Sequence, residues 1–476
     1  MMKLPILIAS GALCSSSLFS QTSRPNIVFI LADDMRGSTI ELLGKESVLT
    51  PNLNRLAADG VIFTNAHIMG GTSGAVSMPS RAMLLTGKYL HHLSKNGAVI
   101  PSSHTTIGES LREVGYKTYH IGKWHSDYAS FNRCFSDGKD IFFGGMADHW
   151  NVPLYNYDSS ARYGKKRPVI TEWNRSNKVD YKDGEYIYSG KHSVDIFTDA
   201  AIDFLTEQKD KSDPFFLYVA YMSPHDPRSM PEKYLQQYDS ALVQLPENFK
   251  KKHPFDNGEL VIRDESLAAL PRVESEVKEH IRSYYAMITH LDDNIGRLIQ
   301  TLKEQGMYEN TMIVFAADNG LAVGQHGLMG KQNVYEHSVS VPLIIRHGGV
   351  AAGSKTDKLC YLIDIFPTLC QVAGASKPSS VDGLSLMPVI EDDKSVRDYL
   401  YYGYRDFQRA VSDGEWKLIE YHVKGDRTTQ LFNLKNDPME KTDLSSDKKY
   451  SSLIKRLRAE MLKQKELTDD NSPFWN

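Results

Sequence analysis

The chain has 476 residues, with 55 Lys plus Arg against 59 Asp plus Glu, which gives a formal net charge of −4 with neutral histidines. Hydrophobic residues make up 41% and charged residues 24%, which excludes a disordered chain and a multi-span membrane protein. The near-neutral balance argues against a nucleic-acid binder, which normally carries a basic excess. The length allows a large α/β domain with a small one beside it.

The first residues predict an export signal. Lys3 precedes a short apolar run and a Ser-rich segment, which is the order found in a secretory signal peptide, assigned here to residues 1–20. The run is too short to span a membrane, and no membrane span is expected. We therefore expect a periplasmic protein, with lipidation of Cys14 as the less favoured alternative. Of the three cysteines in the mature chain, at most two can pair with each other. They are Cys134, Cys360 and Cys370.

Apolar runs that alternate with amphipathic segments predict an α/β fold. Residues 26–32 form a continuous apolar run that is typical of a buried parallel strand. Helices are expected at 50–60, 106–114 and 275–305, and further strands at 117–121, 215–222, 312–316 and 341–345. This alternation favours a mainly parallel central sheet flanked by helices.

Polar side chains follow three of the predicted strands at the point where each strand ends. They are Asp33 and Asp34, then His225, and then Asp318 and Asn319. Because the carboxyl ends of parallel strands share one edge of a sheet, we expect these side chains to lie close together.

The composition shifts near residue 390. Short strands are expected at 410–412, 416–421 and 430–433, followed by a final helix at about 450–465. We therefore predict a catalytic domain over residues 21–390 and a small α+β subdomain with an antiparallel sheet over residues 391–476.

The most specific motif is Ser77-Met-Pro-Ser-Arg81, followed after four residues by Thr86-Gly87. It resembles the active-site signature of the type I, formylglycine-dependent sulfatases of the alkaline-phosphatase-like superfamily. In that family the first residue of the signature is oxidised after translation to 3-oxoalanine (formylglycine). A serine at this position resembles the bacterial carbohydrate sulfatases that a serine-type radical maturase modifies. The resemblance implies a sulfuric ester hydrolase with an alkaline-phosphatase-like large domain.

The resemblance covers nearly the whole mature chain and implies roles for individual residues. The implied catalytic set is Ser77, Arg81, Lys123, His125, His225 and Lys331. The implied metal ligands are Asp33, Asp34, Ser77, Asp318 and Asn319. Carboxylate and amide oxygens suit one Ca²⁺ ion, with Mg²⁺ as the alternative, rather than zinc.

The expected chemistry depends on positive charge around a sulfate ester. Fixed cations and a metal stabilise the charge on the sulfate oxygens in the transition state. A hydrated aldehyde offers two hydroxyls on one carbon, one to attack sulfur and one whose deprotonation expels inorganic sulfate. We assign protonation of the leaving alcohol to His225 and the base to His125, and these two roles can be exchanged.

Secretion and aromatic content favour a sulfated glycan as the substrate, since aromatic faces stack on sugar rings. The Tyr-rich region 144–191 is either a substrate-facing insertion or a solvated loop. Residues expected to bind substrate are His149, Trp150, Tyr155, Asp226 and Arg228. Asp226 and Arg228 either bind vicinal sugar hydroxyls or form a structural salt bridge with each other. We expect exo-action on sulfated galactose, N-acetylgalactosamine or N-acetylglucosamine.

Two other functions fit parts of the sequence. A phosphatase or phosphodiesterase of the same superfamily would use Ser77 unmodified with two zinc ions, but the later metal pair is Asp318-Asn319 rather than Asp-His. A non-catalytic glycan-binding relic of the fold would have no reason to keep the complete set of charged residues. Metal content tests the first alternative, and turnover tests the second.

Overall fold

The structure is a computed structural model that describes residues 24–170, 178–348 and 350–475. The expected signal peptide, residues 1–20, lies outside this range. None of the described helices combines the length and apolarity that a membrane crossing needs. The three cysteines of the mature chain are buried and free, so no disulfide joins them.

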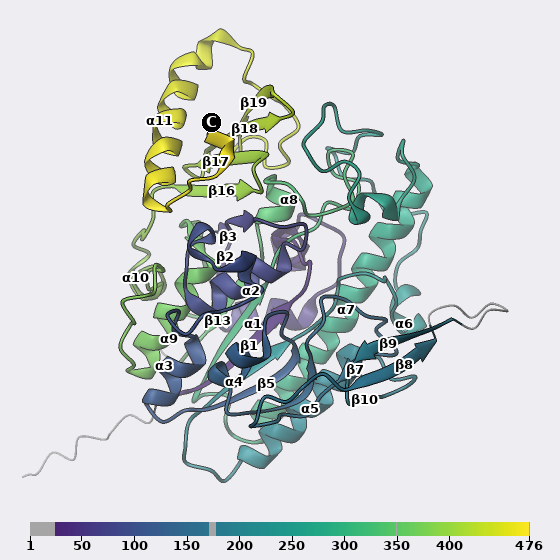
Figure 1. Ribbon diagram of the computed structural model, residues 1–476, viewed down its shortest axis with the longest axis vertical. Coiled ribbons are helices and arrows are strands. Elements are labelled where there is room, and N and C mark those ends of the chain that lie inside the picture. The colour runs from purple at the N-terminus through teal and green to yellow at the C-terminus, as the bar shows by residue number, and fades with distance from the viewer. Residues whose placement is uncertain (1–23, 171–177, 349, 476) are drawn as a thin grey trace, which may run out of the picture.

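An eight-stranded sheet forms the centre of the large part of the molecule (Figure 1). Its strands lie in the order β14-β2-β13-β12-β1-β11-β5-β6. They are β1 (Asn26–Ala32), β2 (Val61–Phe63), β5 (Lys117–Lys123), β6 (Asp137–Phe142), β11 (Phe215–Ala220), β12 (Thr311–Ala317), β13 (Leu343–Arg346) and β14 (Ser354–Thr356). The run from β12 to β6 is parallel, whereas β13 is antiparallel to both of its neighbours. The expected mainly parallel sheet is confirmed.

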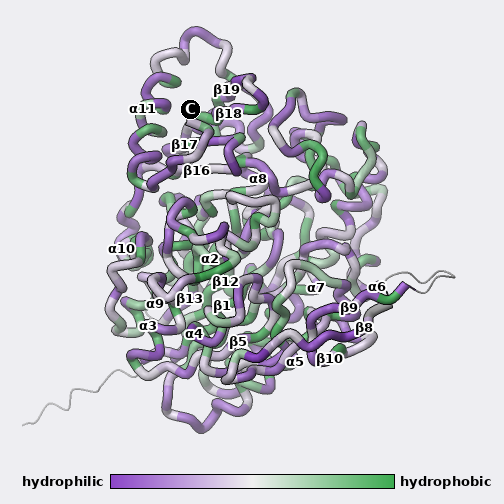
Figure 2. The backbone as a smooth tube through the Cα atoms, viewed as in Figure 1, coloured by the Kyte–Doolittle hydropathy of each residue, from purple (hydrophilic) through white to green (hydrophobic). Residues whose placement is uncertain are grey.

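Two groups of helices surround this sheet. In the first group α1 (Pro51–Ala58), α5 (Ser193–Gln208) and α6 (Glu232–Leu235) all contact α7 (Glu274–Glu304). The second group contains α2 (Ser77–Thr86), α3 (Ile107–Glu113), α4 (Tyr128–Cys134) and α9 (Ile365–Ala373). Every residue of β11 and β12 is buried, as expected for parallel strands covered on both faces. Figure 2 shows hydrophobic residues concentrated along these central strands.

A second sheet lies at the top of Figure 1, in the order β19-β18-β17-β16-β4. It contains β4 (Gly70–Gly71), β16 (Leu400–Tyr404), β17 (Gln408–Ser412), β18 (Trp416–Val423) and β19 (Asp426–Asn433), and α11 (Ser451–Leu467) packs on it. The four C-terminal strands are antiparallel, as predicted, but β16 was not predicted and β4 comes from the large part of the chain. The boundary expected at residue 390 falls within α10 (Met387–Asp392), and the division into domains stays a prediction.

The region 144–191 contains two small antiparallel ladders. In one, β7 (Pro153–Leu154) pairs with β10 (Tyr186–Ile187), and in the other β8 (Lys166–Ile170) pairs with β9 (Val179–Asp183). Hydrophilic residues dominate β8 and β9 (Figure 2). The remaining short elements are the pair β3 (Ala66–His67) and β15 (Cys360–Tyr361), and helix α8 (Glu336–Val339).

Candidate active site

Four adjacent parallel strands bring the predicted site residues to one edge of the large sheet. Asp33 directly follows β1, Lys123 is the last residue of β5, and Asp318 directly follows β12. His225 lies in the loop after β11. The carboxyl ends of neighbouring parallel strands meet at the same edge, which explains the convergence.

Ser77 is the first residue of α2 and is 1% exposed. Its Oγ lies 3.2 Å from Oδ1 of Asp33 and 3.0 Å from Oδ1 of Asn319. Lys331 donates to the same Oγ from Nζ at 3.1 Å. The positive end of the α2 dipole also favours negative charge at this point. Residue 77 therefore lies where metal-type oxygen donors and a fixed cation meet.

Each of three buried carboxylates around Ser77 is paired with a buried cation. The pairs are Lys123–Asp33, Lys331–Asp34 and Arg81–Asp318, with N–O distances of 2.5, 2.5 and 2.8 Å. Three negative and three positive charges leave this cluster close to neutral. A dication and a sulfate monoester anion would together add only one net charge to it.

The charges in this cluster shift the pKa values of its members in opposite directions. Burial, together with the charge of Asp33, raises the pKa of Asp318 to about 6. Burial also opposes ionisation of Asp33, but Lys123 and Arg81 hold the pKa of that carboxyl well below its usual range. Burial lowers the pKa of Lys123 despite the neighbouring carboxylate of Asp33. The cluster thus keeps Asp33 ionised.

The two predicted catalytic histidines differ in environment. Burial and the nearby charge of Lys123 lower the pKa of His125 well below its usual value, so this imidazole is neutral near pH 7. Its Nδ1 is buried and has no hydrogen-bond partner within the described chain. His225 donates from Nδ1 to the backbone carbonyl of Asp226 at 2.7 Å, and its Nε2 lies 3.7 Å from Oδ2 of Asp34. The structure thus brings a neutral imidazole and a histidine whose Nε2 is directed at the cluster to the same site.

The oxygen donors fit a divalent cation. Asp33 and Asp34 present carboxylate oxygens, and Asn319 directs its amide oxygen at Ser77 while its nitrogen donates to Asp34 at 2.8 Å. Ligand atoms of Asp33, Asp34 and His225 lie within 4.8 Å of one another. A donor set dominated by oxygen is typical of hard cations rather than zinc.

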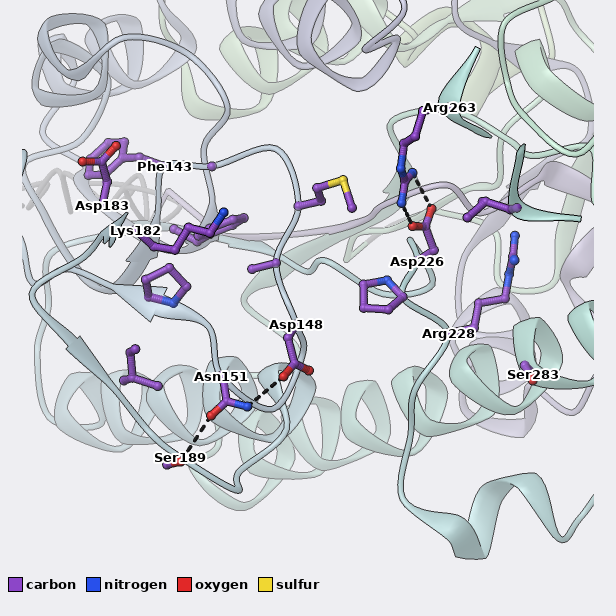
Figure 3. A pocket seen from close by; sticks show the side chains of 18 of the residues that line it. Phe143, Asp148, Asn151, Lys182, Asp183, Ser189, Asp226, Arg228, Arg263 and Ser283 are labelled. Atoms are coloured by element: carbon purple, nitrogen blue, oxygen red, sulfur yellow. Dashed lines mark hydrogen bonds and ion pairs between the residues drawn. The ribbon is translucent and has the colours of Figure 1, made fainter. Parts of the chain in front are cut away.

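A cavity of about 1230 Å³ opens beside this cluster and contains two of the predicted substrate residues (Figure 3). Asp226 is clamped by the guanidinium of Arg263, whereas Arg228 contacts Nδ1 of His280 from Nη1 at 2.7 Å. Asp226 and Arg228 therefore do not form the salt bridge considered as the alternative. The Nε and Nη2 atoms of Arg228 are buried without a partner in the described structure. Arg228 thus brings these two donors to the cavity wall.

The other three predicted substrate residues lie behind the cavity wall. His149 is fully buried and donates from Nε2 to the carbonyl of His225 at 2.9 Å. Tyr155 is 2% exposed and its hydroxyl donates to the carbonyl of Lys165. Trp150 packs edge-on against the ring of His192. None of the three lines the described cavity.

The cavity residues that sequence reasoning missed include the two that contact Asp226 and Arg228. Arg263 lies in a short 3₁₀ turn, and His280 lies on α7. Neither belongs to a local motif, so only the fold brings them beside Asp226 and Arg228. The region 144–191 supplies about half of the cavity wall, which favours the substrate-facing interpretation over the solvated loop.

Comparisons with known proteins identify the family of the chain. A family model described as Sulfatase matches residues 25–375, and one described as N-sulphoglucosamine sulphohydrolase, C-terminal, matches residues 324–467. The chain therefore belongs to the sulfatase family. It is a sulfuric ester hydrolase, and its fold is of the alkaline-phosphatase-like kind.

Individual relatives match over almost the whole chain. An N-acetylglucosamine-6-O-sulfatase of Bacteroides thetaiotaomicron is 26% identical over 99% of this chain and 91% of its own length. An arylsulfatase of Clostridium perfringens is 30% identical over 93% and 95%. A solved structure of a protein in complex with its substrate D-glucosamine-2-N,6-O-disulfate shares 24% identity and a TM-score of 0.74, covering 95% of this chain and 99% of that one. This last likeness bears on the fold alone.

Proposed function

We propose that this sulfatase hydrolyses sulfate esters on glycans with a formylglycine nucleophile made from Ser77. One observation carries the proposal: the Oγ of Ser77 lies among Asp33, Asn319 and Lys331, at the start of a helix. The names of the relatives, which include an N-acetylglucosamine-6-O-sulfatase, support a sugar substrate.

A divalent metal ion and a 3-oxoalanine at position 77 would complete the site. Asp33, Asp34, Asp318, Asn319 and residue 77 would hold one Ca²⁺ ion, with Mg²⁺ as the alternative. Bound there, the dication would polarise the sulfate oxygens. A serine-type radical maturase would convert Ser77 to 3-oxoalanine, whose hydrated aldehyde would supply one hydroxyl to attack sulfur and a second whose deprotonation would allow sulfate to leave.

The charged side chains and the histidines of the site have different proposed roles. Lys123, Lys331 and Arg81 direct fixed positive charge at the sulfate, inside a cluster from which water is largely excluded by burial. His225 donates a proton from Nε2 to the leaving alcohol oxygen. His125, neutral because it is buried, accepts a proton from residue 77 at its ring nitrogen, and the two roles can be exchanged.

The free donors of Arg228 and the carboxylate of Asp226 are proposed to bind sugar hydroxyls next to the ester. Galactose, N-acetylgalactosamine and N-acetylglucosamine sulfates are the proposed substrates, cleaved by exo-action in the periplasm after removal of residues 1–20. Arg228→Ala should lower kcat/KM on the best sugar, while Arg228→Lys restores little because an ammonium cannot replace the planar guanidinium. An unchanged kcat/KM for Arg228→Ala would contradict this role.

A phosphatase with two zinc ions is the second candidate, and the structure gives it little support. Asn319 offers an amide oxygen where such a site needs a histidine nitrogen. Metal analysis of the purified protein separates the two, since one calcium per chain supports the sulfatase and two zinc ions support the phosphatase.

The main test is sulfate release from a panel of sulfated galactose, N-acetylgalactosamine and N-acetylglucosamine by protein co-produced with a serine-type maturase. We expect turnover of one linkage, loss of two hydrogens at Ser77 by mass spectrometry, and no turnover by Ser77→Ala. Ser102→Ala, which changes an exposed serine outside the site, is the matched control. Phosphate release without conversion of Ser77 would overturn the proposal.

A further inference from the structure

The cavity is larger than a single sugar needs. Its volume is about 1230 Å³, whereas pockets for drug-sized ligands usually measure about 300–1,000 Å³. Figure 3 shows that its labelled residues fall into two separated ends. Asp226, Arg228 and Arg263 lie at one end, and Phe143 and Lys182 lie at the other.

The first end borders the catalytic cluster. Asp226 directly follows His225, whose Nε2 faces Asp34. Gly145, which lies between the cavity-lining residues Gly144 and Met146, is close to the ring of His125. An ester that reaches residue 77 must therefore belong to the sugar at this end.

The opposite end offers the chemistry that a second sugar needs. The rings of Tyr128 and Phe143 pack edge to face with their centroids 4.6 Å apart, and both side chains are half-buried in the cavity wall. Exposed aromatic faces stack on sugar rings. Lys182 is exposed beside them and forms no ion pair within the described chain.

The wall between the two ends is polar and ordered. Asn151 donates from Nδ2 to Asp148 at 2.7 Å and accepts from the hydroxyl of Ser189 at 3.2 Å. These groups line the path between the Arg228 end and the aromatic end, as Figure 3 shows. They can exchange hydrogen bonds with hydroxyls along a sugar chain.

We propose that the substrate is a sulfated oligosaccharide of at least two sugars, with the ester-bearing sugar at the Arg228 end and its neighbour stacked on Tyr128 and Phe143. This inference rests on the proposed function and adds the length of the substrate to it. It also assigns a role to the region 144–191, which supplies the polar residues Asn151, Lys182 and Ser189 of the cavity wall along the sugar chain.

The test compares free 6-sulfated N-acetylglucosamine and N-acetylgalactosamine with disaccharides that carry the same sugars at the sulfated end. For the matured enzyme we expect kcat/KM on the preferred disaccharide to exceed that on its free sugar by about 5- to 10-fold, the size of one aromatic stacking contact. Phe143→Leu and Tyr128→Ala should lower kcat/KM on the disaccharide more than on the free sugar, so that this advantage is lost. Phe249→Leu, a partly buried phenylalanine outside the cavity, is the control.

Equal kcat/KM on the free sugar and the disaccharide would overturn the inference without touching the proposed function. Calorimetric binding of the unsulfated disaccharides to Ser77→Ala tests the aromatic end without any catalysis. Weaker binding after Phe143→Leu is added supports the second sugar site, and unchanged binding contradicts it. Absence of sulfate release from every compound, with the binding effect intact, would instead contradict the proposed function.

Discussion

The imidazole of His149 donates from Nε2 to the backbone carbonyl of His225 at 2.9 Å, while its Nδ1 accepts from the hydroxyl of Ser193 at 2.7 Å. Burial lowers the pKa of His149 to about 4, so the ring stays neutral and keeps this arrangement near pH 7. The ring also stacks on His192, which donates from Nε2 to the carbonyl of Ser229. Two buried histidines thus hold both ends of the segment that carries Asp226 and Arg228.

Replacing His149 should therefore impair catalysis more than folding. We expect His149→Ala to lower kcat/KM by about 10- to 100-fold, the usual cost of removing a partner that orients a site residue. His149→Gln keeps an N–H donor and should recover part of the loss. Sulfate release per folded molecule, with folding followed by urea unfolding, measures this. A lower stability with unchanged activity per folded molecule would show that His149 has no positioning role.

Gly145 lies so close to His125 that a methyl group cannot fit. A Cβ at this position would lie 2.7 Å from Nε2 of His125, so Gly145→Ala must displace the imidazole. We expect kcat to fall at least about tenfold, because a small misplacement of a catalytic group is costly, while the thermal midpoint changes little. In a His125→Ala background the same substitution should cost nothing more. Additive losses in this double-mutant cycle would contradict the contact.

Lys417 of β18 contacts two carboxylates, of which Glu336 lies in the large part of the molecule and Glu440 follows the C-terminal sheet. Its fully buried Nζ lies 2.7 Å from Glu336 and 3.1 Å from Glu440. Burial opposes ionisation of Glu336, but Lys417 and His67 hold its pKa well below the usual range. Burial raises the pKa of Glu440 to about 7. Lys417→Met would leave two buried carboxyls without their cation.

The cost of Lys417→Met should increase with pH. A carboxyl whose pKa is raised in the folded protein is protonated below that pKa and costs stability as the pH rises through it. Without Lys417 the pKa values of both carboxyls rise, so we expect a loss of about 3–5 kcal/mol at pH 8 and a smaller one at pH 6. Urea unfolding at the two pH values measures it, with the exposed Lys424→Met as control. Equal losses at both pH values would be inconsistent with this network.

Binding of the metal should stabilise the folded protein. Calcium bound only by the folded chain at 100 times its Kd would add about 2.7 kcal/mol to the free energy of unfolding. We expect chelation to lower the thermal midpoint and calcium to restore it better than zinc does. Asn319→Ala removes one oxygen donor and should weaken the response to calcium. A midpoint insensitive to both chelator and calcium would argue against a metal at this cluster.

The parallel part of the fold could be predicted because its strands are continuous apolar runs. Residues 26–32 and 312–316 correspond to β1 and β12, and the expected helix at 275–305 is α7. The short strands β2 and β16 were missed, since β2 pairs with β13 and one edge of β16 pairs with β4, partners that are distant in the chain. Likewise β4 has only two glycines, which carry no strand signal of their own.

At the site, too, local sequence signals could be interpreted, whereas contacts between distant segments could not. Most residues around Ser77 could be predicted because they lie in a local motif or near a strand end, whereas Lys331 was implied only by the family resemblance. The cavity could not, because its polar contacts cross the fold: Arg263 clamps Asp226, and His280 contacts Arg228. For His149 the prediction was wrong. Its position in the Tyr-rich region indicated contact with the sugar, whereas in the structure its Nε2 donates to the backbone carbonyl of His225.

The two-residue strand β4 has a consequence for how the chain can be altered. Gly70 and Gly71 pair with Gly403 and Tyr404 of β16, and a side chain at Gly70 would collide with the carbonyl of Gly403. The segment that leads into residue 77 is therefore the edge of the C-terminal sheet. A shortened protein ending near residue 390 would leave that segment without its neighbour. If the C-terminal part is exchanged for that of a relative, the new part must pair with the same two glycines to keep residue 77 in place.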